Sequence, residues 1–583
     1  MKMAYYVADF ETTTGKEETH VWAYATVEVG NQDNIMIGTT IDEFMQWCLD
    51  QKESQTIYFH NLKFDGNFIL YWLFEKGFKH INEGEKKETN SFTTLISDKG
   101  LWYSIDLYTY IKGRNVRKIR FLDSLKLIPL SVDAIAKSFH LPIQKLKIDY
   151  SAHNDLPIGS PLTEEEKAYI INDVKIVATA IEYFHKQGLD KMTIGSCALE
   201  EYKKLISKKM FKYWYPTPTY HDDVKKSYRG GFTYLNPKFA EKTVKEGVVF
   251  DVNSLYPSVM RYEYLPYDNP IFFEGKYKED DLYPLYIQMF RCSFDLKSGK
   301  IPTIQIKYGG FRGNEYLTTS GNKEVALCLN SVDMELFLNH YDVYNMEYLS
   351  GWKFKATRGL FDKYIDKWSD AKINAKKEGN HGMYLISKLF LNSLYGKFGT
   401  GNSVCSKVPF YDEDTGKVCF EFGEEKDKDG VYIPMASFIT SYARLKTISS
   451  AQKIQDDYLA GKSDIQFIYA DTDSLHCLSP NHKIPECLDV DATRLGAWKY
   501  ESKFNKAKFL RQKCYIENST EDINEPNPEY EMKITVAGMP TECHKQVTFK
   551  NFKIGASYQG KKLPKNVKGG VILEDVEFTI KPL

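Results

Sequence analysis

The sequence lacks paired cysteines, long apolar runs and a strong charge of either sign. Its 10 cysteines stand singly among 583 residues, which argues against a zinc site or a disulfide framework and suits a reducing compartment. No apolar stretch is long enough for a transmembrane helix, and the residues from Met1 to Asp9 lack the apolar run of a signal peptide. The formal net charge is -1, so a surface for nucleic acid has to be local and offset by acidic residues elsewhere.

What is present indicates a large globular protein with several substructures. A chain of 583 residues is too long for one core, and a hydrophobic content of 43% is enough for sizeable cores. The 41 tyrosines and 35 phenylalanines suit base stacking as well as ordinary packing.

One stretch, 388–399, combines an apolar stripe with a polar face. Three leucines have the spacing of a buried helix stripe: Leu389, Leu391 and Leu394. Lys388, Asn392 and Tyr395 lie at i, i+4 and i+7 and share a different face. Gly396 is expected to end the helix. A lysine, an amide and a phenol on one face suit an anionic ligand that also has a flat ring.

Two apolar strands that end in carboxylates are predicted to point toward this helix. Asp251 follows one of them, and Asp471 and Asp473 follow the other. Two residues apart on a strand, Asp471 and Asp473 are expected to share one face. Crowded carboxylates repel unless a cation lies between them, and hard oxygen ligands suit Mg²⁺. Taken alone, an Asp-x-Asp sequence is more often a surface loop or a helix cap.

A second acidic set occupies the first third of the chain. It consists of four carboxylates: Asp9, Glu11, Asp65 and Asp173. Thr163 and Glu166 form a capping box, which predicts a helix that carries Tyr169 and Asp173 on one face. Such a set suits two-metal hydrolysis, in which one ion activates water and the other stabilises the leaving oxygen. Tyr169 could orient the attacking water.

Three motifs, in this order, resemble the polymerase motifs of family B DNA polymerases. They are Asp-x-x-Ser-Leu-Tyr-Pro from Asp251, Lys-x-x-x-Asn-Ser-x-Tyr-Gly from Lys388 and Tyr-x-Asp-Thr-Asp-Ser from Tyr469. The amino-terminal acids resemble the 3′–5′ exonuclease domain of proofreading polymerases. The resemblance runs from end to end and extends to the protein-primed polymerases of small Bacillus phages (phi-29 type). It implies an α/β multidomain fold, with an RNase H-like exonuclease domain and a right-hand polymerase domain of palm, fingers and thumb.

The resemblance also implies site residues. The catalytic set is Asp9, Glu11, Asp65, Tyr169, Asp173, Asp251, Asp471 and Asp473. The metal ligands are Asp9, Glu11, Asp65, Asp173, Asp251, Val252 and Asp473. The nucleotide-binding residues are Tyr256, Lys372, Lys388, Asn392 and Tyr395. The DNA-binding residues are Thr12, Asn61, Phe64, Ser124, Lys145, Tyr228, Gly230, Gly231, Lys513 and Tyr515.

Within these sets the roles differ. Asp251 and Asp473 are expected to hold two Mg²⁺ ions, with Asp471 in support. Tyr256 is expected under the sugar of the incoming nucleotide, where its ring leaves no room for a 2′-hydroxyl, so deoxynucleotides are expected. One departure concerns Tyr384, which stands where the family carries a lysine one turn before Lys388.

The expected domains are an exonuclease domain over 1–190 and a polymerase domain over 191–583. The polymerase domain is expected to contain an insertion at about 261–359, a hairpin insertion at about 400–433 and a thumb at about 534–583. In the resembling phage polymerases the hairpin helps to close a ring around DNA and splits downstream duplex.

The resemblance implies a DNA-directed DNA polymerase that replicates a linear viral genome. Initiation would be protein-primed, synthesis processive with strand displacement, and errors removed by the 3′–5′ exonuclease. The expected cofactor is Mg²⁺, two ions per active site, with Mn²⁺ as a substitute. The expected partners are template and primer DNA, dNTPs and a terminal protein, and no membrane is expected. The protein is expected to be a monomer in the host cytoplasm.

Two alternatives remain open. A nucleic-acid-primed repair polymerase of family B would share every catalytic motif and differ only in the insertions. A nuclease or DNA-binding protein with an inactive polymerase body would require broken palm acids, and none is broken here.

Overall fold

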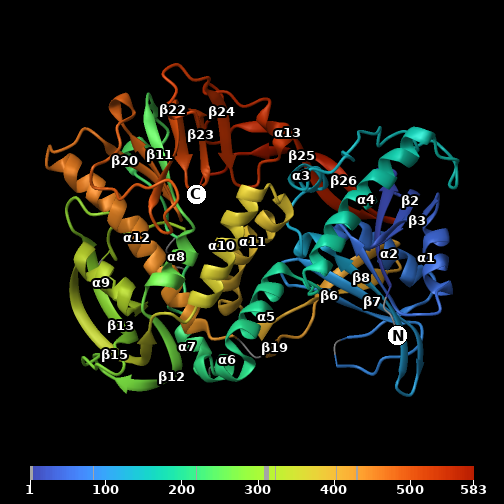
Figure 1. Cartoon of the computed structure of the whole chain (residues 1–583), viewed down its shortest axis with the longest axis horizontal. Helices are drawn as coiled ribbons and strands as arrows, with labels where there is room; N and C mark the ends of the chain where they lie inside the picture. Colours follow the sequence, from blue (N-terminus) through green and yellow to red (C-terminus); the bar gives the residue numbers. More distant parts are fainter. Residues whose placement is uncertain are drawn as a thin grey trace.

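The computed structural model describes residues 4–82, 84–217, 219–306, 314–321, 323–401, 403–427 and 431–582. Small parts of both expected insertions therefore lie outside the described residues. Figure 1 shows an amino-terminal lobe at the right and a larger lobe at the left, with helices α10 and α11 between them.

The amino-terminal lobe is built on an eight-stranded sheet in the order β3-β2-β1-β4-β8-β7-β6-β5. Its strands are β1 (Ala4–Thr12), β2 (Val21–Glu28), β3 (Asn31–Gly38), β4 (Gln55–Phe59), β5 (Lys79–His80), β6 (Ser91–Ile96), β7 (Trp102–Lys112) and β8 (Asn115–Asp123). Its helices are α1 (Ile41–Asp50), α2 (Leu62–Glu75), α3 (Val132–Ser138) and α4 (Glu164–Lys186). Successive residues of β1 face opposite sides, so Val7 packs with α4 while Ala8 packs with α1 and α2.

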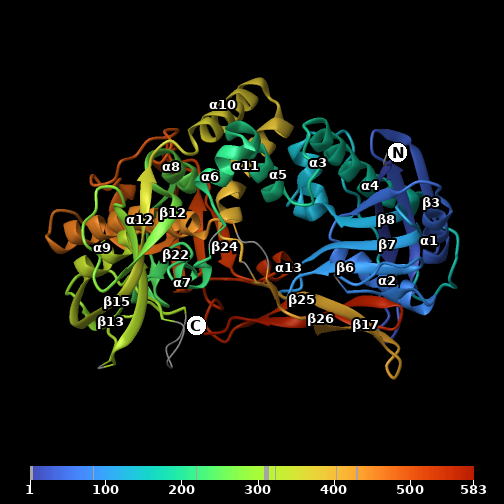
Figure 2. The same cartoon turned by 90° about the horizontal axis from the view of Figure 1, so that it is seen from below.

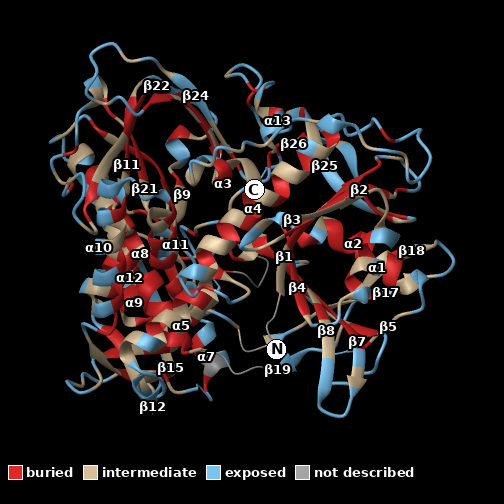
Figure 3. Cartoon of the chain, turned by 45° about the vertical axis from the view of Figure 1, so that its right-hand side comes forward, coloured by how far each residue is buried: buried red, intermediate tan, exposed pale blue. Residues whose placement is uncertain are grey.

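Helices α5 (Ile194–Ile206), α6 (Lys208–Trp214) and α7 (His221–Lys225) connect the two lobes. Helix α5 packs on α11. One hydrophobic cluster runs from α4 through α5 and α11 into the second lobe, so the lobes share a continuous core (Figure 3).

The second lobe has its own eight-stranded sheet, whose main path is β24-β23-β22-β11-β21-β20-β9, while β10 pairs with β22. Its strands are β9 (Thr233–Leu235), β10 (Thr243–Val244), β11 (Gly247–Val252), β20 (Gln466–Asp471), β21 (Ser474–Leu478), β22 (Trp498–Arg511), β23 (Cys514–Thr520) and β24 (Glu531–Val536). Its helices are α8 (Leu255–Tyr262), α10 (Asp362–Glu378), α11 (His381–Phe398) and α12 (Ile433–Leu459). Helix α12 packs on α8, α11 and β20, and so supports both the sheet and the paired helices α10 and α11.

Three smaller units complete the fold. The segment expected as the first insertion forms a four-stranded sheet with one helix: β12 (Leu265–Glu274), β13 (Leu285–Leu296), β14 (Val325–Asn330), α9 (Ser331–His340) and β15 (Tyr341–Thr357). The second expected insertion contains the predicted hairpin, formed by β17 (Lys407–Asp412) and β18 (Lys417–Phe422). Two short strands pair at its base, β16 (Ser403–Val404) and β19 (Lys426–Asp427). The carboxy-terminal unit contains α13 (Thr541–His544), β25 (Ser557–Val567) and β26 (Gly570–Thr579).

The carboxy-terminal hairpin β25–β26 reaches the amino-terminal lobe. Figure 2 shows this hairpin and β17 running together below the amino-terminal lobe. Strand β18 contacts β25, and α2 contacts β26. Strand β24 belongs to the sheet of the second lobe, so the separate carboxy-terminal unit begins after it.

Two local predictions are wrong. Helix α11 does not end at Gly396 but continues to Phe398, with Gly399 as its C-cap. Asp471 and Asp473 do not lie on one continuous strand, because Thr472 between them has φ 60° and turns the chain from β20 into β21. Among the helices that the structure describes, none combines the length and apolar character needed to cross a membrane.

Candidate active sites

Three elements bring the amino-terminal acids together. Asp9 and Glu11 come from β1, Asp65 from the first turn of α2 and Asp173 from the middle of α4. The predicted capping box starts α4, with Thr163 as N-cap and Glu166 at N3. Asp9 and Asp173 line a cavity of about 120 Å³ together with His60 and Lys145.

These carboxyl groups repel one another in a buried place. Burial and then Asp173 raise the pKa of Asp9 to about 7. Burial, followed by Asp9, raises the pKa values of Glu11 and Asp65 well above their usual range. Asp65 and Asp173 each keep one buried carboxylate oxygen without a hydrogen-bond partner.

Within the described ranges no three acid, histidine or cysteine side chains are preassembled around a cation position. The unpartnered oxygens and the mutual repulsion nevertheless fit a divalent cation, because a cation between carboxylates satisfies both.

Tyr169 and Lys145 lie beside these acids. Tyr169 is buried, and burial followed by Glu11 raises the pKa of its hydroxyl, which therefore stays protonated. Its oxygen lies 3.0 Å from the Tyr150 hydroxyl oxygen, a neighbour that the sequence did not single out. Lys145 forms an ion pair with Asp173, and Asp173 raises the lysine pKa against the opposing effect of burial. Lys145 is thus in direct contact with the acidic set.

The residues predicted to hold a DNA strand fall into two groups. Asn61, in the left-handed conformation with φ 81°, and Phe64 line a cavity of about 400 Å³. The hairpin insertion and the carboxy-terminal hairpin also line this cavity. Ser124 is fully buried, and its hydroxyl bonds to the Phe59 carbonyl and to His60. Ser124 is therefore not accessible to a DNA strand in this conformation, and its predicted role stays a prediction. Thr12, although largely buried, ends β1 directly after the acids.

The second acidic site lies where β11 meets β21. Asp251 is paired in register with Ser474, and the main-chain N–H of Val252 donates to the Asp473 carbonyl over 2.8 Å. Burial, then Asp473 and then Glu501, raise the pKa of Asp251 to about 7. The pKa of Asp473 is also raised, mainly by burial. Two half-buried carboxyl groups with raised pKa values again fit a cation.

Asp471 has a different environment. Both of its carboxylate oxygens accept from Lys513 Nζ over 2.8 Å, and Oδ1 also accepts from the Thr233 hydroxyl over 3.0 Å. Tyr515, close by, packs against Tyr469 with ring centroids 5.2 Å apart. Asp471 is thus joined directly to Lys513, and to Tyr515 through Tyr469, whose hydroxyl donates to Asp471 Oδ2 over 3.3 Å.

The residues predicted to bind the incoming nucleotide lie where α8, α10 and α11 meet. Lys388 and Asn392 are exposed on α11, with Tyr395 half-buried beyond them. Tyr395 stacks on Tyr256. The pKa of Lys372 on α10 is lowered by burial and then by Lys388 and Lys376, so positive charge is concentrated here. A polyanion would relieve that repulsion.

The segment Tyr228–Gly231, which carries three of the predicted DNA-binding residues, touches the turn between Asp471 and Asp473. Thr472 N–H donates to the Phe232 carbonyl over 2.7 Å, and a Cβ on Gly231 would lie 2.5 Å from Thr472 Oγ1. Tyr228, ahead of the glycines, lies against Gly399 at the end of α11. The segment is therefore in contact with both the turn and the central helix.

Arg444 is a residue that the sequence analysis missed. Its guanidinium donates to the Arg229 and Gly230 carbonyls over 2.8 and 2.7 Å, and it is paired with Asp333 of α9. Arg444 therefore connects the first insertion to the glycine segment. The available signal was a single arginine within an otherwise apolar and small-residue stretch of α12.

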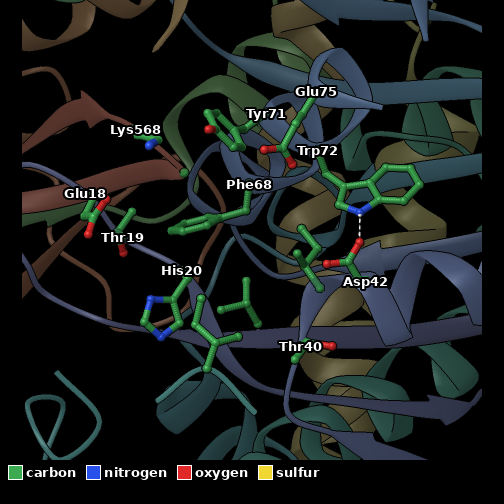
Figure 4. A pocket seen from close by; sticks show the side chains of 14 residues that line it. Glu18, Thr19, His20, Thr40, Asp42, Phe68, Tyr71, Trp72, Glu75 and Lys568 are labelled. Carbon is green, nitrogen blue, oxygen red and sulfur yellow. Dashed lines mark hydrogen bonds between the residues drawn. The ribbon is translucent and has the colours of Figure 1, made fainter. Parts of the chain in front are cut away.

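A third cavity, of about 320 Å³, lies away from both acidic sites, between the amino-terminal lobe and the tip of the carboxy-terminal hairpin (Figure 4). Beside it the Thr19 N–H donates to the Lys568 carbonyl over 2.9 Å. Asn566 Nδ2 donates to Val418 of the hairpin insertion over 2.7 Å. The carboxy-terminal hairpin is therefore held by the amino-terminal lobe and by the hairpin insertion.

Known proteins match this arrangement. Residues 49–160 and 157–485 match the family described as DNA polymerase type B, organellar and viral. The DNA polymerase of Bacillus phage M2 is 46% identical over 598 residues, covering 100% of both chains. Phi29 DNA polymerase complexed with primer-template DNA superposes with a TM-score of 0.93 at 45% identity, over 100% of both chains. Its ternary complex with primer-template DNA and incoming nucleotide substrates gives 0.92 at 46% identity, also over 100% of both.

The predicted fold class is thereby confirmed, with an exonuclease domain and a polymerase domain in one α/β multidomain chain. Family B polymerases generally use divalent metal ions. The chain belongs to the family B DNA polymerases and is a DNA polymerase of the phi29 type.

Proposed function

We propose that this polymerase replicates a linear viral genome by itself, starting from a terminal protein and displacing the non-template strand as it proceeds. The observation that carries the proposal is that two other parts of the chain form hydrogen bonds with the carboxy-terminal hairpin. Thr19 and Lys568 join it to the amino-terminal lobe, and Asn566 joins it to the hairpin insertion. These contacts would close a ring around template and primer DNA without a separate clamp protein.

For synthesis we assign Asp251, Asp473 and Val252 to two Mg²⁺ ions, with Mn²⁺ as a substitute. When bound, divalent ions lower the pKa of an attacking hydroxyl or water and neutralise charge on the leaving group. Lys372 and Lys388 would bind the triphosphate of the incoming dNTP.

The stacked rings of Tyr256 and Tyr395 would lie against the sugar of the incoming dNTP and against the new base pair. Asn392 would lie beside these rings. We assign the primer strand to Lys513, which bonds to Asp471, and to the segment Tyr228–Gly231, which contacts Thr472. Tyr515 joins them from its position against Tyr469.

For proofreading we assign 3′–5′ hydrolysis to the amino-terminal acids. Asp9, Glu11, Asp65 and Asp173 would hold the second pair of ions. Tyr169, which stays protonated, would orient the attacking water. Asn61 and Phe64 would receive the single-stranded 3′ end, since they line the cavity that continues under the two hairpins.

The remaining partners are proposed from family likeness. A hydroxyl of the terminal protein would replace the primer hydroxyl during initiation. By the same likeness, the protein would act as a monomer in the host cytoplasm.

Extension of one primer on a single-stranded circle, with dNTPs and Mg²⁺ but no accessory protein, tests the proposal. Products many circles long are expected. Products that stop at one circle would overturn strand displacement and favour a gap-filling enzyme. Asp473→Ala is expected to abolish extension while sparing 3′–5′ hydrolysis, and Asp9→Ala to do the reverse. Loss of both activities in either variant would contradict two separate sites.

A further inference from the structure

A long segment without helix or strand, 141–163, passes over the amino-terminal acidic site. It carries Lys145, which pairs with Asp173, and Tyr150, whose hydroxyl lies 3.0 Å from that of Tyr169. Long irregular segments inside a domain are usually functional, and they need specific contacts to keep one conformation. The contacts that fix this segment therefore decide whether Lys145 and Tyr150 reach the acids.

His153 provides one fixed point of the segment. It is 3% exposed, although it lies in a surface turn. Its ring stacks on Trp22 of β2, with centroids 4.0 Å apart and planes at 1°. Its Nε2 lies 3.0 Å from Glu166 Oε1. A buried polar ring that has both an aromatic partner and a carboxylate partner is held in one orientation.

Glu166 connects this fixed point to the acidic helix. Its second oxygen, Oε2, accepts from the main-chain N–H of Thr163 over 2.8 Å and completes the capping box of α4. Glu166, Tyr169 and Asp173 lie at i, i+3 and i+7 and so share one face of α4. One carboxylate therefore fixes both the overlying segment and the beginning of the helix beneath it.

The next residue fixes the segment on its other side. Asn154 Oδ1 accepts from the Thr14 N–H over 2.8 Å, and Asn154 Nδ2 donates to Thr14 Oγ1 over 2.8 Å. Thr14 follows the end of β1, the strand that carries Asp9 and Glu11. The two neighbouring residues His153 and Asn154 thus connect the segment to α4 and to the end of β1, two of the three elements that supply the acids.

We infer that His153 is a positioning residue for 3′–5′ hydrolysis, a role that rests on the exonuclease function proposed above. Its bond to Glu166 and its stack on Trp22 hold the segment so that Lys145 meets Asp173 and Tyr150 meets Tyr169. His153 itself does not touch the acids or the 3′ end.

The test uses the full chain with His153→Ala, His153→Gln, Lys145→Ala and the double variant of His153→Ala with Lys145→Ala. The glutamine amide can still donate to Glu166. His80→Ala is the matched control, because His80 belongs to the same domain and has one side-chain hydrogen bond, to Thr94. Each variant is measured for degradation of a single-stranded oligonucleotide from its 3′ end, with kcat and KM separated, and for primer extension.

His153→Ala is expected to lower kcat for degradation roughly tenfold, the effect of losing one hydrogen bond to a charged group. KM and extension are expected to stay unchanged. His153→Gln is expected to recover most of the rate. The double variant is expected to be no slower than Lys145→Ala, because both substitutions disrupt the same arrangement. His80→Ala is expected to match the unsubstituted protein.

Several results would overturn the inference. One is an unchanged kcat for His153→Ala. Another is an equal loss of extension, which would mean general destabilisation. A third is a double variant slowed by the product of the two single effects. If the unsubstituted protein degrades the oligonucleotide no faster than Asp9→Ala does, the proposed exonuclease function itself fails and the inference with it; otherwise only the role of His153 is refuted.

Discussion

Tyr256 of α8 and Tyr395 of α11 stack with ring centroids 4.0 Å apart and planes inclined by 22°. Both rings are partly buried, so neither can swing away without leaving the other uncovered. The pair forms a rigid surface beside Lys388, at the place assigned to the sugar and base of the incoming nucleotide. A rigid ring at this place would exclude a 2′-hydroxyl by contact.

Replacement of the first ring should therefore relax sugar selection. Tyr256→Val is expected to raise incorporation of ribonucleotides relative to deoxynucleotides by roughly tenfold or more, the range in which shape alone discriminates. Single-nucleotide incorporation with matched dNTP and rNTP measures the ratio. Tyr256→Phe keeps the ring and should keep the selection. An unchanged ratio for Tyr256→Val would mean that another side chain excludes the hydroxyl.

The glycine pair offers a matched steric comparison. A Cβ on Gly231 would lie 2.5 Å from Thr472 Oγ1, whereas a Cβ on Gly230 meets nothing within 4 Å. Gly231→Ala should displace the turn that holds Asp471 and Asp473 and slow extension by roughly ten- to a hundredfold, because small misplacements of reacting groups are costly. Gly230→Ala creates no such steric conflict and should slow extension clearly less than Gly231→Ala does, although Gly230 belongs to the segment assigned to the primer strand. Equal rates for the two variants in single-nucleotide incorporation would contradict the contact.

The raised pKa values predict how metal binding depends on pH. The pKa of Asp251 and that of Asp9 are each about 7 in the folded protein, above the value of about 4 in an unfolded chain. Metal-free protein is therefore stabilised by these groups at low pH and loses that contribution as pH rises through about 7. Cations need the ionised carboxylates, so Mg²⁺ should raise the unfolding temperature more at about pH 8 than at about pH 6.

Calorimetric scans of protein freed of metal with a chelator, with and without Mg²⁺, measure this difference. Asp251→Asn removes one titrating group and should weaken the pH dependence. A Mg²⁺ effect that is equal at both pH values, or larger in acid, would show that the carboxylates are already ionised without metal.

Where interactions are local, the sequence predicted them correctly. The capping box of Thr163 and Glu166 lies within four residues, and it starts α4 as expected. The shared face of Lys388, Asn392 and Tyr395 follows from helical spacing alone. Both features could be predicted from neighbouring residues alone.

Long-range contacts explain the failures. Glycine inside a helix costs only about 1 kcal/mol relative to alanine, and burial of Leu394 and Phe398 on either side of Gly396 outweighs it. The turn at Thr472 has a positive φ that its sequence does not suggest. Thr447, 25 residues earlier, stabilises this turn by donating its hydroxyl to the Thr472 carbonyl over 2.6 Å. Neither effect can be inferred from neighbouring residues.

The tip of the carboxy-terminal hairpin allows a direct test of ring closure. Gly569 has φ +90°, and a Cβ there would lie 1.8 Å from the Thr19 carbonyl oxygen of the amino-terminal lobe. Gly555, in the same carboxy-terminal unit, has φ +83° with nothing within 4 Å. Alanine at either position carries a similar backbone penalty of about 1 kcal/mol. Only Gly569→Ala should push the hairpin away from the lobe.

The assay is primer extension on a single-stranded circle in the presence of excess competitor DNA. Gly569→Ala is expected to shorten the products roughly tenfold, while incorporation of the first nucleotide is unchanged. The tenfold figure assumes that the free energy of DNA binding weakens by about 1.4 kcal/mol. Gly555→Ala should give full-length products and so control for backbone strain. If both variants shorten the products equally, strain within the carboxy-terminal unit is responsible. If neither does, the Thr19–Lys568 contact is not needed to enclose DNA, and the hairpin insertion has to retain it alone.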